Sequence, residues 1–98
     1  MLEHIVLFKF QKDASQEKVD AVMHQLRELP KSIDAIVQLS CGPNFSDRSQ
    51  GFDYALRVQL RDKEGLETYR THPAHVSVLE NTIKPILENI LAVDYLDS

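Results

Sequence analysis

The strongest constraint on how this chain can fold lies in residues 4–10, which read HIVLFKF. β-branched and aromatic residues dominate this segment, as is typical of a β-strand. Side chains alternate between the two faces of a strand, so Val6 and Phe8 share one face while Ile5 and Leu7 share the other. Both faces are mostly apolar, and both need to be covered. Helices can cover one face, and we expect a second copy of the chain to cover the other.

The rest of the chain alternates between strand and helix patterns. After Asp13 or Ser15, either of which suits a helix N-cap, apolar residues recur at spacings of three and four until Pro30 ends the helix. The expected order is strand 4–10, this helix, strand 33–41, loop 42–51, strand 52–60, helix 63–69, a helical stretch over 76–87 with a kink at Pro85, and strand 90–95. This β-α-β-β-α-β order predicts an α+β, ferredoxin-like subunit with a four-stranded antiparallel sheet.

Composition narrows the class of protein further. A chain of 98 residues supports one hydrophobic core, so residues 1–98 are expected to form a single domain. Its 15 acidic and 11 basic residues are interleaved, which does not predict a nucleic-acid partner. No apolar run approaches the roughly 18 residues that cross a bilayer, and Glu3 and His4 do not fit a signal peptide. The single cysteine, Cys41, excludes an internal disulfide and favours a cytoplasmic location.

The segment that could carry chemistry is Tyr69–His75, which reads YRTHPAH. Pro73 suits the first turn of a helix, because its missing amide donor costs nothing there. His75 would then lie in that first turn, facing inward. The field at a helix N-terminus lowers the pKa of an imidazole, so His75 is expected to be neutral and able to accept a proton.

Three interpretations of the two histidines remain open on the residues alone. In the first, His72 caps the helix break and His75 is a hydrogen-bonded core residue. In the second, His75 lines a ligand pocket as a base or polar anchor, with Tyr69 and His4 nearby. The third is a metal site, but His-x-x-His lacks a third ligand beyond Glu80 or His4 and is not a zinc signature. Neither a metal nor a cofactor is expected.

Several segments together resemble a known family over essentially the whole chain. They are HIVLFKF, Gly42–Ser46 (GPNFS), Gly51–Leu56 (GFDYAL), Tyr69 with His72–His75 (HPAH), and Val93–Tyr95 (VDY). In this order they resemble the stress-responsive dimeric α/β barrel (Dabb) domain. The resemblance implies a ferredoxin-like subunit, a homodimer whose sheets face each other as a barrel, and a cavity between sheet and helices in each subunit. Most members have no established activity.

The same motif is similar to that of a cofactor-free plant enzyme in the family, olivetolic acid cyclase, which closes a linear polyketide. This resemblance implies that Tyr69 and His75 form a catalytic pair and that His4 lies in the pocket. Tyr54 stands where the cyclase has a pocket histidine, and Leu26 where it has a pocket tyrosine, so the cyclase substrate is not carried over. The candidate catalytic residues are His75 and Tyr69, and the candidate substrate-binding residues are His4, Tyr54 and His72.

The expected function is that of a small cytoplasmic stress-response A/B barrel protein that binds a small apolar or oxygenated ligand. One alternative is a cofactor-free cyclase, lyase or isomerase with His75 as base and Tyr69 as its partner. Another is a purely structural homodimer. The cavity separates these hypotheses: side chains that fill it favour the structural role, and an open cavity where the polar residues converge favours a ligand. The candidates to fill it are Phe8, Leu26, Leu66 and Leu79.

Overall fold

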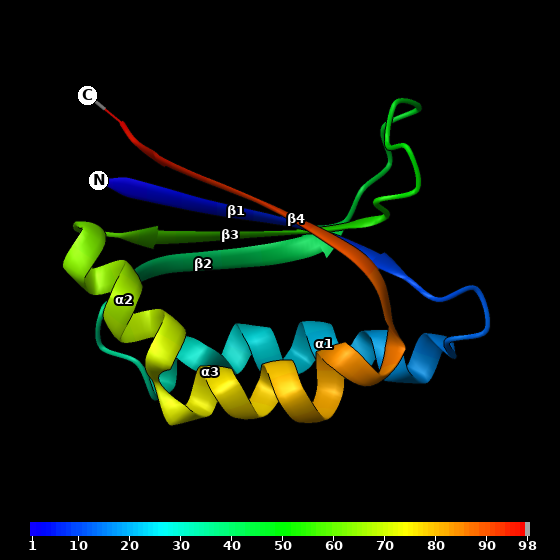
Figure 1. Cartoon of the computed structure of the whole chain (residues 1–98), viewed down its shortest axis with the longest axis horizontal. Coiled ribbons are helices and arrows are strands. Elements are labelled where there is room, and N and C mark those ends of the chain that lie inside the picture. The colour runs from blue at the N-terminus through cyan, green and yellow to red at the C-terminus, as the bar shows by residue number, and fades with distance from the viewer. Residues whose placement is uncertain (98) are drawn as a thin grey trace.

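Four antiparallel strands form one sheet, and the helices cover only one of its faces (Figure 1). The computed structural model describes residues 1–97. The elements are β1 (Leu2–Phe10), α1 (Gln16–Glu28), β2 (Ile36–Pro43), β3 (Tyr54–Leu60), α2 (Lys63–Thr71), α3 (Pro73–Val78) and β4 (Leu87–Leu96), with 3₁₀ turns at Leu29–Lys31 and Lys84–Ile86 and a π-helical turn at Leu79–Ile83. The strand order is β2-β3-β1-β4, which confirms the ferredoxin-like prediction.

Helix α1 begins where its cap side chain can serve the first turn. The Ser15 hydroxyl accepts a hydrogen bond from the Lys18 amide (3.2 Å), which makes Ser15 rather than Asp13 the N-cap. The helix buries one apolar stripe against the sheet, formed by Val19, Val22, Met23 and Leu26. The chain then passes through the 3₁₀ turn that contains Pro30.

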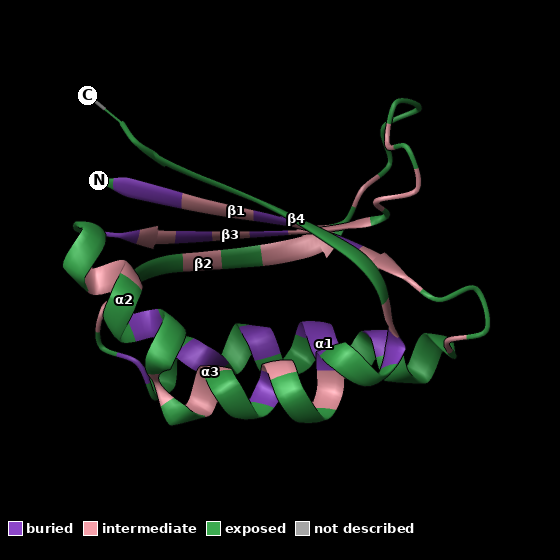
Figure 2. Cartoon of the chain, viewed as in Figure 1, coloured by how far each residue is buried: buried purple, intermediate pink, exposed green. Residues whose placement is uncertain are grey.

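Strand β1 is central and hydrogen-bonded along both edges. It pairs with β3 from Leu2↔Leu60 to Phe8↔Tyr54, and with β4 from Leu2↔Leu96 to Phe10↔Leu87. Even-numbered side chains of β1 point to the helices, where Leu2, Val6 and Phe8 are buried. The core therefore lies between the sheet and its helices, as the purple bands in Figure 2 show.

Several expected boundaries are wrong, and three of them have a clear local reason. Ile33 was expected in a strand, but the 3₁₀ turn at Leu29–Lys31 delays β2 to Ile36, and Ile33 is a core residue of the connection between them, 1% exposed. Phe52 was expected to open the next strand, but its amide donates to the Ser49 carbonyl (3.0 Å) in a turn, and β3 begins at Tyr54. Leu87 was expected in a helix, yet it opens β4 because the helical stretch ends in a 3₁₀ turn at Pro85.

The other face of the sheet has no helix over it. Ile5 and Leu7 of β1 are only half-buried there, and their β4 partners Val93 and Leu91 are 48% exposed. Tyr95, on the same face, is 50% exposed. We call Ile5, Leu7, Leu91, Val93 and Tyr95 the open face. Contiguous exposed apolar surface of this kind is uncommon on monomeric proteins.

One carboxylate is buried at the edge of the open face. Glu3 is 5% exposed and accepts hydrogen bonds from Gln59 Nε2 (2.9 Å) and Arg57 Nε (2.8 Å). The Gln59 hydrogen bond, helped by the Arg57 guanidinium, lowers the pKa of Glu3 against the opposing effect of burial. The charge is thus paired by two residues of β3, which supports the β1–β3 register.

We predict that Ile33→Ala destabilises the fold by about 2–5 kcal/mol, because it removes a fully buried side chain and leaves a cavity. Urea unfolding at one fixed protein concentration measures this change. The control is Val76→Ala on the exposed side of α3, 41% exposed, which should change stability by less than about 0.5 kcal/mol. A loss below about 1 kcal/mol for Ile33→Ala would contradict the assignment of Ile33 to the core.

Candidate functional site

A cavity of about 300 Å³ lies between the helices and the inner face of β1 and β4. Most of its wall is apolar, and its polar side chains are His4, Tyr69, Arg70, His75 and Asp94. Phe8, Leu26, Leu66 and Leu79, the four side chains that could have filled it, line it instead. This volume is at the lower end of the range for small-molecule sites.

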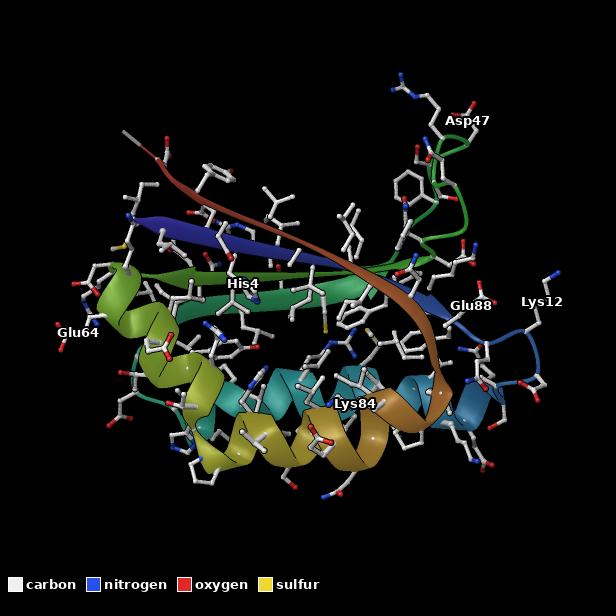
Figure 3. The ribbon with its side chains drawn as sticks, viewed as in Figure 1. His4, Lys12, Asp47, Glu64, Lys84 and Glu88 are labelled. Atoms are coloured by element: carbon white, nitrogen blue, oxygen red, sulfur yellow. The ribbon has the colours of Figure 1, made fainter. Side chains whose placement is uncertain are left out.

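The three residues expected to converge do so, from three different elements. His4 comes from β1, Tyr69 from α2 and His75 from α3. The ring centroids of Tyr69 and His75 are 4.5 Å apart, and those of Tyr69 and His4 are 5.7 Å apart in an edge-on arrangement. Figure 3 shows His4 pointing from the sheet toward the helices. Both imidazoles thus contact the same phenol ring.

The break between α2 and α3 is what brings Tyr69 to His75. Residues six positions apart on an unbroken helix would point about 240° apart around its axis. Here His72 is extended (φ −63°, ψ 134°) and Pro73 opens α3. The Nδ1 atom of His72 accepts a hydrogen bond from the Ala74 amide (3.0 Å), so His72 is the N-cap of the new helix.

His75 is held in one tautomer. Its Nδ1 lies 3.0 Å from the carbonyl oxygen of Arg70, which can only accept, so Nδ1 carries the proton and Nε2 keeps its lone pair. Burial lowers the pKa of His75, against the opposing effect of the Arg70 carbonyl. The expected direction is confirmed, although burial and not the helix terminus is the largest cause. A neutral imidazole with a free Nε2 is a hydrogen-bond acceptor and a base.

Tyr69 is the most unusual residue of the cavity. Its side chain is 1% exposed, and its hydroxyl, buried, finds no hydrogen-bond partner within residues 1–97. Burial raises the pKa of Tyr69 well above its ordinary value, so the phenol stays neutral. A buried hydroxyl without a partner costs about 1–3 kcal/mol. An oxygen or nitrogen atom of a ligand would satisfy it.

Sequence reasoning missed two residues of the site. Asp94 on β4 pairs with His4 across the sheet, and its carboxylate contacts His4 Nδ1. This pairing orients the imidazole and leaves its Nε2 free to face elsewhere. Arg70 contributes the carbonyl that fixes His75. Two signals could have found Asp94: its place in the VDY segment and the pairing of the first and last strands. No side-chain pattern marks a backbone carbonyl.

Two predicted binding residues lie outside this cavity. The Tyr54 hydroxyl accepts a hydrogen bond from Gln16 Nε2 (3.1 Å), and its ring packs against Phe10, with centroids 5.6 Å apart. His72 is occupied as a helix cap. Neither contributes to the cavity wall. Both therefore have structural partners in this chain.

Within the described residues, no group of three or more His, Cys, Asp or Glu side chains is placed to hold a metal ion. No helix among them has the length and apolar character to cross a membrane. The site's chemistry is that of a phenol, two imidazoles and a carboxylate at one end of an apolar cavity.

These features define a class: a ferredoxin-like α+β domain with a cavity between its sheet and its helices. Within that class the family follows from the sequence comparison. The family model described as "Stress responsive A/B Barrel Domain" (Dabb) matches residues 2–97, and the chain belongs to this family.

Curated relatives carry the same domain within longer proteins. The chain is 33% identical over 97 residues to a stress-response A/B barrel domain-containing protein of Arabidopsis thaliana, an alignment that covers 98% of the chain and 36% of the relative. It is 32% identical over 100 residues to a second protein of this description from the same plant, covering 98% of the chain and 47% of the relative. The chain thus spans a third to a half of these relatives.

Solved structures have the same fold. Arabidopsis thaliana At3g17210 superposes with a TM-score of 0.90 at 24% identity, covering 100% of this chain and 96% of that one. A dimeric ferredoxin-like protein of unknown function from Thermobifida fusca gives 0.84 at 26% identity (96% and 88% covered). The hydroxynitrile lyase of Passiflora edulis gives 0.89 at 18% identity (99% and 93% covered).

We predict that the imidazole of His75 titrates below the roughly 6.5 of histidine in a short peptide. Because the folded-state pKa is the lower one, the unfolded chain binds this proton more tightly. The contribution to stability is complete above the unfolded-state pKa and is lost as the pH falls through the folded-state pKa. Nitrogen-15 NMR of the histidine rings, assigned with His75→Gln, measures both pKa and tautomer. An Nε2-protonated ring, or a pKa above about 6.5, would contradict the geometry.

Proposed function

We propose that residues 1–98 form a single homodimeric A/B barrel domain that binds a small, largely apolar ligand bearing an oxygen. The observation that carries this proposal is the buried Tyr69 hydroxyl, which has no partner within residues 1–97 and belongs to a side chain that lines a cavity. Buried polar groups in native proteins are almost always paired, so an unpaired one beside a cavity supports a contact with a bound molecule. The single cysteine supports a reducing compartment such as the cytoplasm.

The polar and apolar ends of the cavity indicate which class of ligand fits it. Tyr69 and His75 both line its polar end. A phenol hydroxyl that donates and an imidazole nitrogen that accepts form the pair that a carbonyl with its enol, or a phenol, requires. Its far end, around Phe8, Ile83 and Ile90, is apolar and suits an alkyl chain or ring. A highly charged ligand would lose its hydration against these walls.

A second candidate function is cofactor-free proton transfer, which the state of His75 favours. Nε2 would take a proton from the carbon next to a ligand carbonyl; the electron pair of the broken C–H bond would form the C=C bond of an enolate, and the π pair of the carbonyl would move to its oxygen. The Tyr69 hydroxyl would donate a hydrogen bond to the resulting enolate oxygen. Such a step begins a cyclase, lyase or isomerase reaction. The Passiflora edulis lyase is an enzyme with this fold, although its likeness to this chain is one of fold alone.

Homodimer formation through the open face is supported by two observations. Ile5, Leu7 and their β4 neighbours form an apolar surface with no cover in the described part of the chain. The Thermobifida fusca relative, 26% identical, is described as dimeric. A two-fold dimer would place two such faces together, and burial of apolar area would drive their association.

We predict that Tyr69→Phe keeps or raises stability but weakens ligand binding. Removing the hydroxyl relieves an unpaired buried group and should stabilise the ligand-free protein by up to about 1–3 kcal/mol. Binding of nonane-2,4-dione, a β-diketone with an apolar tail, should weaken at least about tenfold, the value of one lost hydrogen bond. Chemical denaturation and NMR titration measure the two effects.

The matched control is Tyr54→Phe, whose hydroxyl has a partner in Gln16. It should lose about 0.5–1.5 kcal/mol and bind the diketone normally. The same probe in deuterium oxide separates binding from catalysis: exchange of its C3 protons above the buffer rate, abolished in His75→Ala, supports the second candidate. No binding, together with a loss of about 1–3 kcal/mol in His75→Ala, would leave only a structural role.

We predict that Leu7→Asp yields a monomer or insoluble protein, because a carboxylate on the open face cannot be desolvated against an apolar partner. Sedimentation velocity at micromolar concentration distinguishes monomer from dimer. Val76→Asp, on the helical side, is the control and should sediment like wild type. A wild-type chain that stays a folded monomer would refute the dimer.

A further inference from the structure

The loop between β2 and β3 carries the most exposed apolar side chain in the described residues. Phe45 is 100% exposed, whereas the other large exposed apolar side chains range from 40% to 54%. A single half-exposed apolar residue needs no explanation, but a phenylalanine wholly in water forfeits all of its burial free energy. The loop therefore holds Phe45 away from the body of the subunit.

The loop stands on the same side of the sheet as the open face. In Figure 1 it rises from the ends of β2 and β3 away from the helices, and Figure 3 places Asp47 at its tip. Where the loop returns toward β3, Gly51 packs against the side chain of Lys9, so closely that a Cβ on Gly51 would lie 2.8 Å from Lys9 Cε. Lys9 is an odd-numbered β1 residue, on the same face as Ile5 and Leu7. Phe45 does not line the ligand cavity, which is on the other side of the sheet.

The loop is ordered before it meets a partner. The Asn44 amide donates to the Asp53 carbonyl (2.7 Å), and Asn44 Nδ2 donates to the Phe52 carbonyl (2.8 Å), which closes its base. The Ser46 amide donates to Asn44 Oδ1 (3.0 Å), so Phe45 sits inside a hydrogen-bonded turn. Glycine suits position 51, where φ is +87°. A pre-ordered loop loses little entropy on docking.

We propose that the 44–53 loop is an arm that clasps a second copy of this chain, with Phe45 as its anchor. This inference rests on the proposed homodimer. A second copy seated on the open face would lie directly beside the arm, because both project from the same side of the sheet. The tip carries one acid and one base, Asp47 and Arg48, so two identical arms do not repel each other. In a two-fold dimer each arm contacts the other subunit, so the interface contains two copies of the Phe45 contact.

The first test is the dimer dissociation constant of the full chain, from sedimentation velocity over a concentration series. Phe45→Ser should raise it by roughly 10- to 100-fold, as truncation of an aromatic anchor does. Phe45→Leu should change it by less than about threefold, and Val76→Ser, on the helical side, should leave it unchanged. Far-UV circular dichroism checks that each variant is folded. A dimer dissociation constant for Phe45→Ser within about twofold of wild type would overturn the proposal that the loop is an arm.

A second measurement does not depend on loss of affinity. The chain contains no tryptophan, so Phe45→Trp introduces a single reporter. Its emission should shift to shorter wavelength as concentration rises, in step with dimer formation seen by sedimentation. A dimer whose tryptophan still emits as in water would overturn the arm and leave the homodimer standing. A wild-type chain that is monomeric throughout would overturn both, and the ligand cavity would be unaffected.

Discussion

Every functional feature of this fold depends on β1, which is hydrogen-bonded along both edges and apolar on both faces. Its even-numbered side chains build the core and carry His4 into the cavity, and its odd-numbered ones, Ile5 and Leu7, form the open face. A strand alternates with a period of two, so a slip of one residue would move His4 out of the cavity and expose the core. The hydrogen bonds that Glu3 accepts from Gln59 and Arg57 oppose that slip. In a shifted register the Glu3 carboxylate would lose both donors.

The site is assembled by an interruption rather than by a regular element. Helix α2 ends at Thr71, and α3 starts at Pro73 under a histidine cap. This junction turns the chain so that Tyr69 and His75, which a continuous helix would separate, lie against each other. The Arg70 carbonyl remains available at the junction, since no α-helical amide four residues on claims it, and it accepts a hydrogen bond from Nδ1 of His75. One break therefore sets the position and the tautomer of the imidazole, while burial lowers its pKa.

The sequence predicts those parts of the fold that depend on local patterns. Strand β1, helix α1 and the break at His72–Pro73 all follow from periodicity, caps and proline geometry. The convergence of His4, Tyr69 and His75 needed the family resemblance, because spacing across the break decides nothing. Asp94 belongs to the VDY segment of that resemblance but was given no role in the site, since it is 90 residues from His4 and joins it only through sheet pairing. Tyr54 and Ile33 were misplaced because neighbouring side chains and an added 3₁₀ turn, not the residues' own patterns, determine where they lie.

The two proposed roles of the domain meet on β4. This strand lies at the edge of the sheet, where its outer side chains Leu91, Val93 and Tyr95 face solvent and its inner ones, Ile90, Ala92 and Asp94, line the cavity. An edge strand exposed along its length is held less firmly than a covered one. A partner subunit on the open face would immobilise β4 and with it the carboxylate that orients His4. Assembly and ligand binding are then linked: a ligand that prefers the ordered cavity also favours the dimer, because any species that binds one state stabilises that state.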